Sequence, residues 1–130
     1  MAYYDTDFAV VRYDESCDAV IGELTEFTTG EDFREYMEAL IDALETEDTD
    51  RMIADSSDFD SALTEEDQVW SVKDWSPRAQ ESGLDHMAMV MPESVVAEMS
   101  IDQVVEMAND TINRELFDDF EEAKQWVRRQ

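Results

Sequence analysis

The sequence is poor in residues that staple or interrupt a small fold, with one cysteine, two prolines and three glycines among 130 residues. A single cysteine, Cys17, excludes an intramolecular disulfide and gives no sign of an oxidising compartment. Basic residues are also scarce, with 9 Lys and Arg against 35 Asp and Glu and a formal net charge of -26. Nucleic acids and anionic membrane surfaces are bound through basic patches, so this composition argues against both as direct partners.

Long apolar runs are missing as well. No stretch approaches the ~20 apolar residues of a membrane-spanning helix. The N-terminus, residues 1–5, lacks the basic and apolar regions of a secretory signal peptide. We therefore expect a cytoplasmic protein without membrane insertion.

The acidic residues are spread through the chain and do not form a tail. Residues 1–65 carry 20 acids and 3 bases, and residues 66–130 carry 15 acids and 6 bases. A hydrophobic content of 43%, arranged with clear periodicities, indicates that the chain folds despite this charge. In molar salt, where repulsion is screened within ~3 Å, a carboxylate-coated surface stays hydrated and soluble. The composition therefore predicts one folded domain adapted to high salt.

The longest uncharged apolar run is His86–Met91, which is closed by Pro92. In a chain with this much charge, such a run is typical of a strand buried on both faces. We predict that it is a central strand of a sheet. Met87, Met89 and Met91 alternate with the other residues, so one face of this strand consists of methionine.

The first half of the chain predicts a hairpin, a helix and a third strand. Two β-rich runs, residues 8–13 and 19–24, lie at hairpin distance. A helix that opens at Thr28 or Thr29 follows, and residues 51–54 form the next strand. The apolar positions of this helix repeat at helical spacing: Phe33, Tyr36, Met37, Leu40, Ile41 and Leu44.

A second helix is expected between this strand and the predicted central strand. Thr64 with Asp67 three residues later is typical of a capping box. Ser76-Pro77 restarts the helix, because proline suits the first helical position. Gly83 is placed to end it in a left-handed conformation.

The C-terminal third predicts a helix, a short strand and a last helix. Ser100 with Gln103 forms a capping box, and only a short turn is expected before it, over residues 94–99. Leu116-Phe117 is the short strand, and Asp119 begins the last helix. The predicted order is ββαβαβαβα, an α/β fold with a mixed sheet of four to five strands and about four or five helices.

Several of these positions resemble one family. Residues 27–33 open the first helix, residues 53–55 end the third strand, and Glu66-Asp67 with Trp70 begin the second helix. Residues 83–90 lead into the central strand, and residues 117–127 form the last helix. Over most of its length the chain resembles the SpoIIAA-like, STAS/SEC14-type small domains. The resemblance implies a single SpoIIAA-like domain over residues 1–130, and it leaves the activity unassigned.

Two better-known relatives suggest directions for the function. STAS domains bind partner proteins and can be switched by phosphorylation of Ser or Thr, whereas SEC14-type domains carry lipids. Asp55-Ser56-Ser57-Asp58 superficially resembles the STAS switch turn. It lacks the glycine and follows the wrong strand, so we do not carry the phosphorylation site over.

Five residues form the candidate ligand site: Trp70, Trp75, Arg78, Met87 and Met89. The two indoles either cap the sheet as core residues, or one lines a groove between the helices and the sheet, with Arg78 available for an anionic head group. The methionine face either fills the core or looks onto an adaptable pocket or a subunit interface.

No catalytic or metal-binding residue is predicted. His86 has no second ligand near it in sequence and is expected to be structural. Asp55, Asp58 and Asp60 lack the glycine and the terminal glutamate of a calcium loop. No cofactor is therefore expected.

The sequence predicts a non-enzymatic binding or regulatory module, because no nucleophile, base and orienting group can be assembled. The alternative is a carrier of a small apolar or lipid-like ligand, and an enzyme is a third reading that a polar cluster in a cleft would favour. The expected partner is thus a protein or a small apolar molecule.

A homodimer is also expected. If most helices fall on one face of the sheet, the short segments around Trp75 and Ser94 would cover the other face only partly. An apolar surface of the sheet or its flanking helices would then mediate the association, with repulsion between the subunits screened by salt.

Overall fold

The computed structural model describes residues 2–26, 30–59, 63–108 and 111–130. In chain order its elements are β1 (Ala2–Asp5), β2 (Ala9–Asp14), β3 (Ala19–Leu24), α1 (Glu31–Glu47), β4 (Arg51–Asp55), α2 (Glu65–Trp70), η1 (Ser71–Trp75), α3 (Ser76–Glu81), β5 (His86–Val90), α4 (Val95–Met107), β6 (Asn113–Phe117) and α5 (Phe120–Arg128). The π-helical turn η1 joins α2 and α3 without a break, so residues 65–81 form one helical run, the α2–α3 run. The described residues thus form six strands and four helical bodies.

All six strands belong to one sheet, in the order β1-β2-β3-β4-β5-β6. The first three strands pair antiparallel, and β3 to β6 pair parallel. The α/β class, the mixed sheet and the element order from β2 onward agree with the sequence prediction. The predicted count of four to five strands is wrong, because β1 adds a sixth strand at the edge. Four residues with two adjacent tyrosines are too few for an alternating pattern to reveal.

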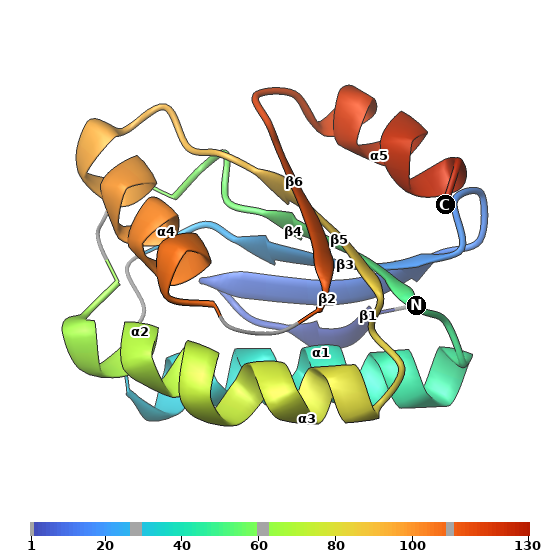
Figure 1. The fold of residues 1–130 in the computed structure, drawn as a ribbon, viewed down its shortest axis with the longest axis horizontal. Coiled ribbons are helices and arrows are strands. Elements are labelled where there is room, and N and C mark those ends of the chain that lie inside the picture. Colours follow the sequence, from blue (N-terminus) through green and yellow to red (C-terminus); the bar gives the residue numbers. More distant parts are fainter. Residues whose placement is uncertain (1, 27–29, 60–62, 109–110) are drawn as a thin grey trace.

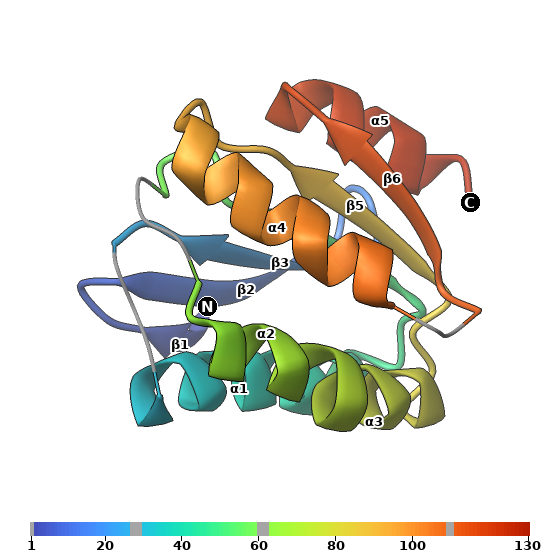
Figure 2. The ribbon, with the colours of Figure 1, turned by 60° about the vertical axis from the view of Figure 1, so that its left-hand side comes forward.

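Helices cover both faces of the sheet, but unequally. Among the described helices, α5 alone packs on one face, while α1 and the α2–α3 run lie on the other (Figure 1). Figure 2 shows α4 on the α1 side, between α2 and β6. The segments around Trp75 and Ser94 therefore lie on the same side as α1. The prediction that they cover the opposite face is wrong, because α5 covers it.

Each face of the sheet has its own apolar core. On the α5 side, Ile21, Ile53 and Val90 pack with Ala123 and Val127. The larger core lies on the α1 side and combines strand residues with the inner faces of the helices, among them Val11, Val20, Leu40, Leu44, Met52, Trp75 and Leu84.

The predicted central strand is an interior strand of the sheet. β5 pairs with β4 on one side and β6 on the other. Ala88 and Val90 belong to the core on the α5 side, and Met87 and Met89 pack on the α1 side. Burial on both faces is thus confirmed, although β5 is second from one edge and not at the centre.

The helix starts agree with the sequence in part. The Thr64 hydroxyl accepts a hydrogen bond from the Asp67 N–H at 3.1 Å, which confirms that cap. The predicted start at Ser100 is wrong, because the N-cap of α4 is Ser94, six residues earlier. Ser100 lies buried inside α4, where its hydroxyl donates to the carbonyl of Ala97 at 2.8 Å.

Three further predicted helix termini can be compared with the structure. Gly83 follows α3 with a φ of 108°, as expected for a left-handed helix end. Asp119 precedes α5 but forms no side-chain capping bond. Thr28 and Thr29, predicted to open α1, lie outside the described residues.

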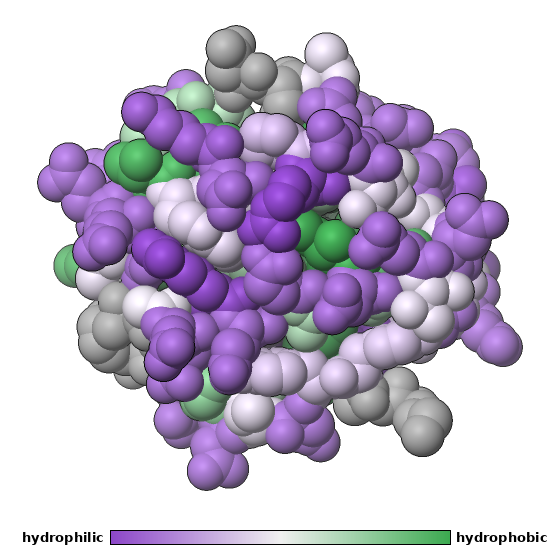
Figure 3. Space-filling view, turned by 90° about the horizontal axis from the view of Figure 1, so that it is seen from below, coloured by the Kyte–Doolittle hydropathy of each residue, from purple (hydrophilic) through white to green (hydrophobic). Residues whose placement is uncertain are grey.

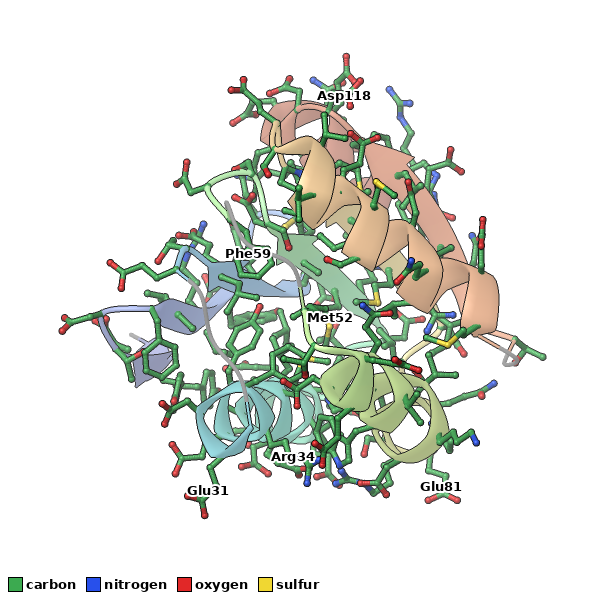
Figure 4. All side chains as sticks on the ribbon, turned by 90° about the vertical axis from the view of Figure 1, so that its left-hand side faces the viewer. Glu31, Arg34, Met52, Phe59, Glu81 and Asp118 are labelled. Atoms are coloured by element: carbon green, nitrogen blue, oxygen red, sulfur yellow. The ribbon has the colours of Figure 1, made fainter. Side chains whose placement is uncertain are left out.

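Charged side chains project away from these layers. Figure 3 shows the face with α1 and the α2–α3 run, which is mostly hydrophilic with small hydrophobic areas. In Figure 4, Met52 lies in the interior between the sheet and the helices, whereas Glu31, Glu81 and Asp118 point outward.

Candidate functional site

A partly enclosed cavity lies between the sheet and the helices on the α1 side. The parallel register places Gly22 beside Ala54 and Ala54 beside Met89 in one row across the sheet. Met87 and Arg114 pair in the neighbouring row, and both line the cavity. Tyr36 and Leu40 fill the space above Gly22, whereas Ala54 lines the cavity with a small side chain. The floor of the cavity is therefore low at Ala54.

Three helical segments form the walls. α4 contacts α2 and η1, and it forms the outer wall over the β5 and β6 part of the sheet (Figure 2). The wall residues come from α1, η1 and α4: Phe33, Tyr36, Met37, Leu40, Ser71, Trp75, Ile101 and Val104.

The π-helical turn arranges the wall at η1. The Ser71 carbonyl accepts from the Ser76 N–H, five residues on, and from the Ser76 hydroxyl at 2.9 Å. The Trp75 indole N–H donates to the carbonyl of Met37 at 2.7 Å, which ties η1 to α1. Single π turns inside α-helices are frequent at functional sites. Here the turn directs Ser71, Trp75 and Ser76 toward the same cavity.

The cavity volume is about 80 Å³. For comparison, a cavity of about 150 Å³ binds benzene, and one water molecule takes ~30 Å³ of liquid volume. The space therefore suits a chain of a few heavy atoms. Met37, Met87 and Met89 line it, and their unbranched side chains can shift to admit a somewhat larger guest.

Arg114 brings a charge to an otherwise neutral lining. It is half-buried on β6, and its Nη2 donates to the hydroxyl of Ser76 at 3.3 Å. The Ser76 hydroxyl in turn donates to the Ser71 carbonyl, and the Ser71 hydroxyl donates to the Asp67 carbonyl at 2.9 Å. The hydroxyl protons of both serines are thus used by backbone carbonyls.

Tyr36 also brings a polar group to the lining, and the residue is only 4% exposed. Its hydroxyl lies so close to β3 that a Cβ atom on Gly22 would be 2.5 Å away. Burial raises the pKa of Tyr36, and the carboxylates of Asp55 and Glu23 raise it further, so the group stays a donor.

The structure brings together three of the five candidate residues. Trp75, Met87 and Met89 line the cavity, whereas Trp70 and Arg78 do not. Trp70 is half-buried between helices, edge-on to Phe33 with ring centroids 6.2 Å apart, and the Arg34 guanidinium lies 5.2 Å from its ring.

Arg78 lies away from the cavity, where two carboxylates hold it. Its Nη1 donates to Glu38 at 2.8 Å, and its Nη2 contacts both Glu38 and Asp74. The hydrogen bond to Glu38 raises the pKa of Arg78. The cation beside the cavity is Arg114, which the sequence prediction missed. In the sequence, alternation along β6 places Arg114 and Leu116 on the same face of the strand. It does not show which side of the sheet that face covers.

Other chemically distinctive residues lie elsewhere. His86 sits at the start of β5, with Nδ1 at 3.3 Å from the Asn113 amide and its ring edge-on to Trp126. Cys17 is buried in the core on the α5 side. Asp55 accepts from the N–H and hydroxyl of Ser57, and Asp60 lies outside the described residues.

The described residues contain no group of three or more His, Cys, Asp or Glu side chains that could hold a metal ion. No helix in the described ranges has the length and apolar character needed to cross a membrane.

α4 has a second notable face, which points to solvent. Four of its apolar side chains are exposed: Val95 by 69%, Val96 by 60%, Met99 by 57% and Met107 by 40%. We call these four residues the α4 strip. Clustered apolar exposure of this kind marks interaction surfaces more often than chance.

The sequence and the fold can be compared with known proteins. A model of the SpoIIAA-like family matches residues 20–128, from β3 to α5. The chain belongs to the SpoIIAA-like family. Among solved structures, this SpoIIAA-like chain is similar to an uncharacterized protein of the DUF3478 family with a SpoIIAA-like fold from Shewanella loihica PV-4. The TM-score is 0.60 and the identity 14%, over 95% of this chain and 97% of that one, which shows the fold. No curated protein matches the chain.

Proposed function

We propose that this SpoIIAA-like protein is a non-enzymatic binding module that holds a small apolar molecule in the cavity between the sheet and α4. The observation that carries the proposal is the lining of the cavity, in which apolar side chains from α1, β4, β5, η1 and α4 surround unfilled space. Unfilled apolar space weakens packing, because the lining atoms lack contacts on one side. A guest of matching size would restore those contacts.

The proposal joins two interpretations of the sequence. It keeps a binding role, and it takes the small apolar ligand of the carrier alternative as the ligand class. Trp75, Met87 and Met89 are its proposed ligand-binding residues, in a protein that works in a high-salt cytoplasm. Support comes from the three methionines of the lining, since thioether side chains adapt to guests of imprecise shape.

Isothermal titration calorimetry with 1-butanol, a short-chain alcohol that suits the size of the cavity, tests the proposal in molar KCl. We expect saturable binding to the parent chain and none to an Ala54→Leu variant, whose side chain would occupy the cavity. Ala39→Leu is the matched control, because Ala39 is a half-buried alanine of α1 that does not line the cavity. It should bind like the parent. Absence of saturable binding to the parent chain would contradict the proposal, and so would equal binding to Ala54→Leu.

The exposed α4 strip favours a second candidate function, association of two copies of the chain. α4 has acidic side chains at Glu98, Asp102 and Glu106 beside the strip, and molar salt would screen their repulsion between subunits. Of the two contacts expected from the sequence, the sheet or its flanking helices, the α4 strip favours a flanking helix, since α5 covers the other face of the sheet. Light scattering in molar KCl should give the mass of two chains, and Met99→Asp should give the mass of one. A parent mass of one chain would contradict the dimer.

A further inference from the structure

The sheet ends at the edge strand β6, which is open on one side. In the described part of the chain, β6 pairs with β5 alone, and Figure 2 shows it at the margin of the sheet. The Asn113 N–H donates to Asp85, and the Phe117 carbonyl accepts from the Met91 N–H, both toward β5. Successive residues of a strand turn their main-chain groups to opposite edges, so the N–H and C=O of Leu116 point to the open edge.

β6 lacks the features that usually protect the edge of a sheet. Edge strands are commonly blunted by bulges, prolines or lysines. The opposite edge, β1, has such an irregularity, since its register with β2 shifts between Ala2 and Tyr4. β6 pairs with β5 without a shift and contains no proline or lysine. Its Leu116 is 42% exposed. This edge is therefore suited to accept another strand.

We propose that β6 of a second copy adds antiparallel to this edge, so that two six-stranded sheets join into one. The inference rests on the second candidate function, the association of two copies, and names the main-chain contact between them. Most dimers have twofold symmetry, and two antiparallel strands of one sheet are related by an axis perpendicular to that sheet. Such an axis places both α4 strips on the same face of the joined sheet, one on either side of it.

The charges on β6 decide the register. Opposite residues of an antiparallel pair face the same side of the sheet, so one residue lies on the axis and faces its own copy. The interior residues of β6 are Arg114, Glu115 and Leu116. An axis at Arg114 would oppose two guanidinium groups, and an axis at Glu115 two carboxylates, and like charges directly opposite each other are destabilising. The register centred on Leu116 opposes two apolar side chains, and the main-chain groups of this residue form two hydrogen bonds between the copies.

This contact also suits the acidity of the chain. The net charge of -26 on each copy acts at long range, and molar salt screens it within ~3 Å. Main-chain hydrogen bonds and apolar contacts act at short range, so they persist in such salt. They therefore suit the association of two acidic copies better than surface ion pairs do.

Engineered cysteines report the register. In a Cys17→Ala background, Leu116→Cys places one thiol of each copy at the axis. The Cα atoms of a hydrogen-bonded antiparallel pair lie ~5.5 Å apart, within the range of a disulfide. We expect a covalent dimer on a denaturing gel after mild oxidation in molar KCl. Glu115→Cys is the matched control, because its two copies would be diagonal neighbours ~7–8 Å apart and should cross-link poorly.

A charge on the axis should separate the copies. Leu116→Lys opposes two ammonium groups at the centre of the contact, so light scattering should give the mass of one 15.0 kDa chain in place of two. Glu115→Lys is the control: residue 115 lies beside Ala88, on the α5 side of the sheet, and the variant should keep the mass of two chains. Both variants lower the net negative charge, so long-range repulsion cannot explain a loss of the dimer.

Each outcome supports or overturns the inference. A parent mass of one chain overturns it together with the dimer, and leaves the edge to an extended segment of another protein and the cavity function untouched. If the parent is a dimer and Leu116→Lys keeps the mass of two chains, β6 pairing is overturned and a dimer through the α4 strip alone stands. Cross-linking of Glu115→Cys as fast as that of Leu116→Cys overturns the register.

Discussion

Substitution of Gly22 by alanine tests the packing that shapes the cavity. An ideal Cβ at this position would lie 2.5 Å from the Tyr36 hydroxyl oxygen and 2.6 Å from Cδ2 of Leu40. Both distances are shorter than any relaxed contact of a methyl group. Tyr36 and Leu40 are 4% and 1% exposed, so neither side chain can swing into solvent. The alanine must therefore push α1 away from β3 or force a side chain off its rotamer.

Two effects of opposite sign determine how much Gly22→Ala changes the free energy of unfolding. Overpacking of a filled core costs about 1–3 kcal/mol, whereas replacing glycine by alanine restricts the unfolded chain and stabilises by ~0.4–1 kcal/mol. We expect a net loss of about 1–2 kcal/mol in the free energy of unfolding, or roughly 3–10 °C in Tm for a chain of this length. Urea unfolding in molar KCl measures it, because guanidinium chloride would change the ionic strength.

A double-mutant cycle identifies the cause. Tyr36→Phe removes the oxygen nearest the new methyl group, so Gly22→Ala should be less destabilising in that background, with a coupling of about 0.5–1 kcal/mol. Gly83→Ala is the control: it strains a φ of 108° where a Cβ would meet nothing within 4 Å, and it should be additive with Tyr36→Phe. If Gly22→Ala is as stable as the parent, or is additive with Tyr36→Phe, the close packing of α1 on β3 is refuted.

Three further predictions follow from charge and burial. Circular dichroism should show a lower Tm at about 10 mM KCl than at about 2 M, because the Debye length grows from ~3 Å at molar salt to ~30 Å; equal values would refute adaptation to high salt. The hydrogen bond that Tyr13 donates to Asp18 at 2.6 Å raises the pKa of Tyr13 to about 12. Its contribution to stability should be present below the unfolded pKa of ~10 and be lost as the pH rises through about 12, and Tyr13→Phe should remove the phenolate absorbance step there. Burial raises the pKa of the Cys17 thiol, so an aromatic disulfide reagent should modify it only as fast as the chain unfolds; rapid modification of the native protein would contradict its burial.

The sequence was informative where one signal dominated. The apolar spacing of residues 33–44 predicts α1, and the uncharged run at 86–91 predicts an interior strand. Both patterns are clear because they differ from the charged sequence around them. Local signals failed where two interpretations compete. Ser100 has the spacing of a cap, but its hydroxyl bonds within α4, and Ser94 provides the cap six residues earlier.

The site was less predictable than the fold because it depends on register and helix geometry. Met87 and Met89 were found from alternation alone, yet Arg114 joins them only through the pairing of β5 with β6. Trp75 lies in the wall because of a π-helical turn, which no residue pattern in the sequence indicates. The low floor at Ala54 likewise requires knowledge of which residues share a row across the sheet.

The most direct test of the proposed ligand binding in the cavity is a titration of 1-butanol followed by the methionine methyl signals in NMR spectra recorded in molar KCl. The methionines report on separate places: Met37, Met87 and Met89 line the cavity, whereas Met99 and Met107 are exposed on α4. Binding in the cavity predicts saturable shifts of the first three signals and none of the other two. Shifts confined to Met99 and Met107, or no shifts at all, would contradict it.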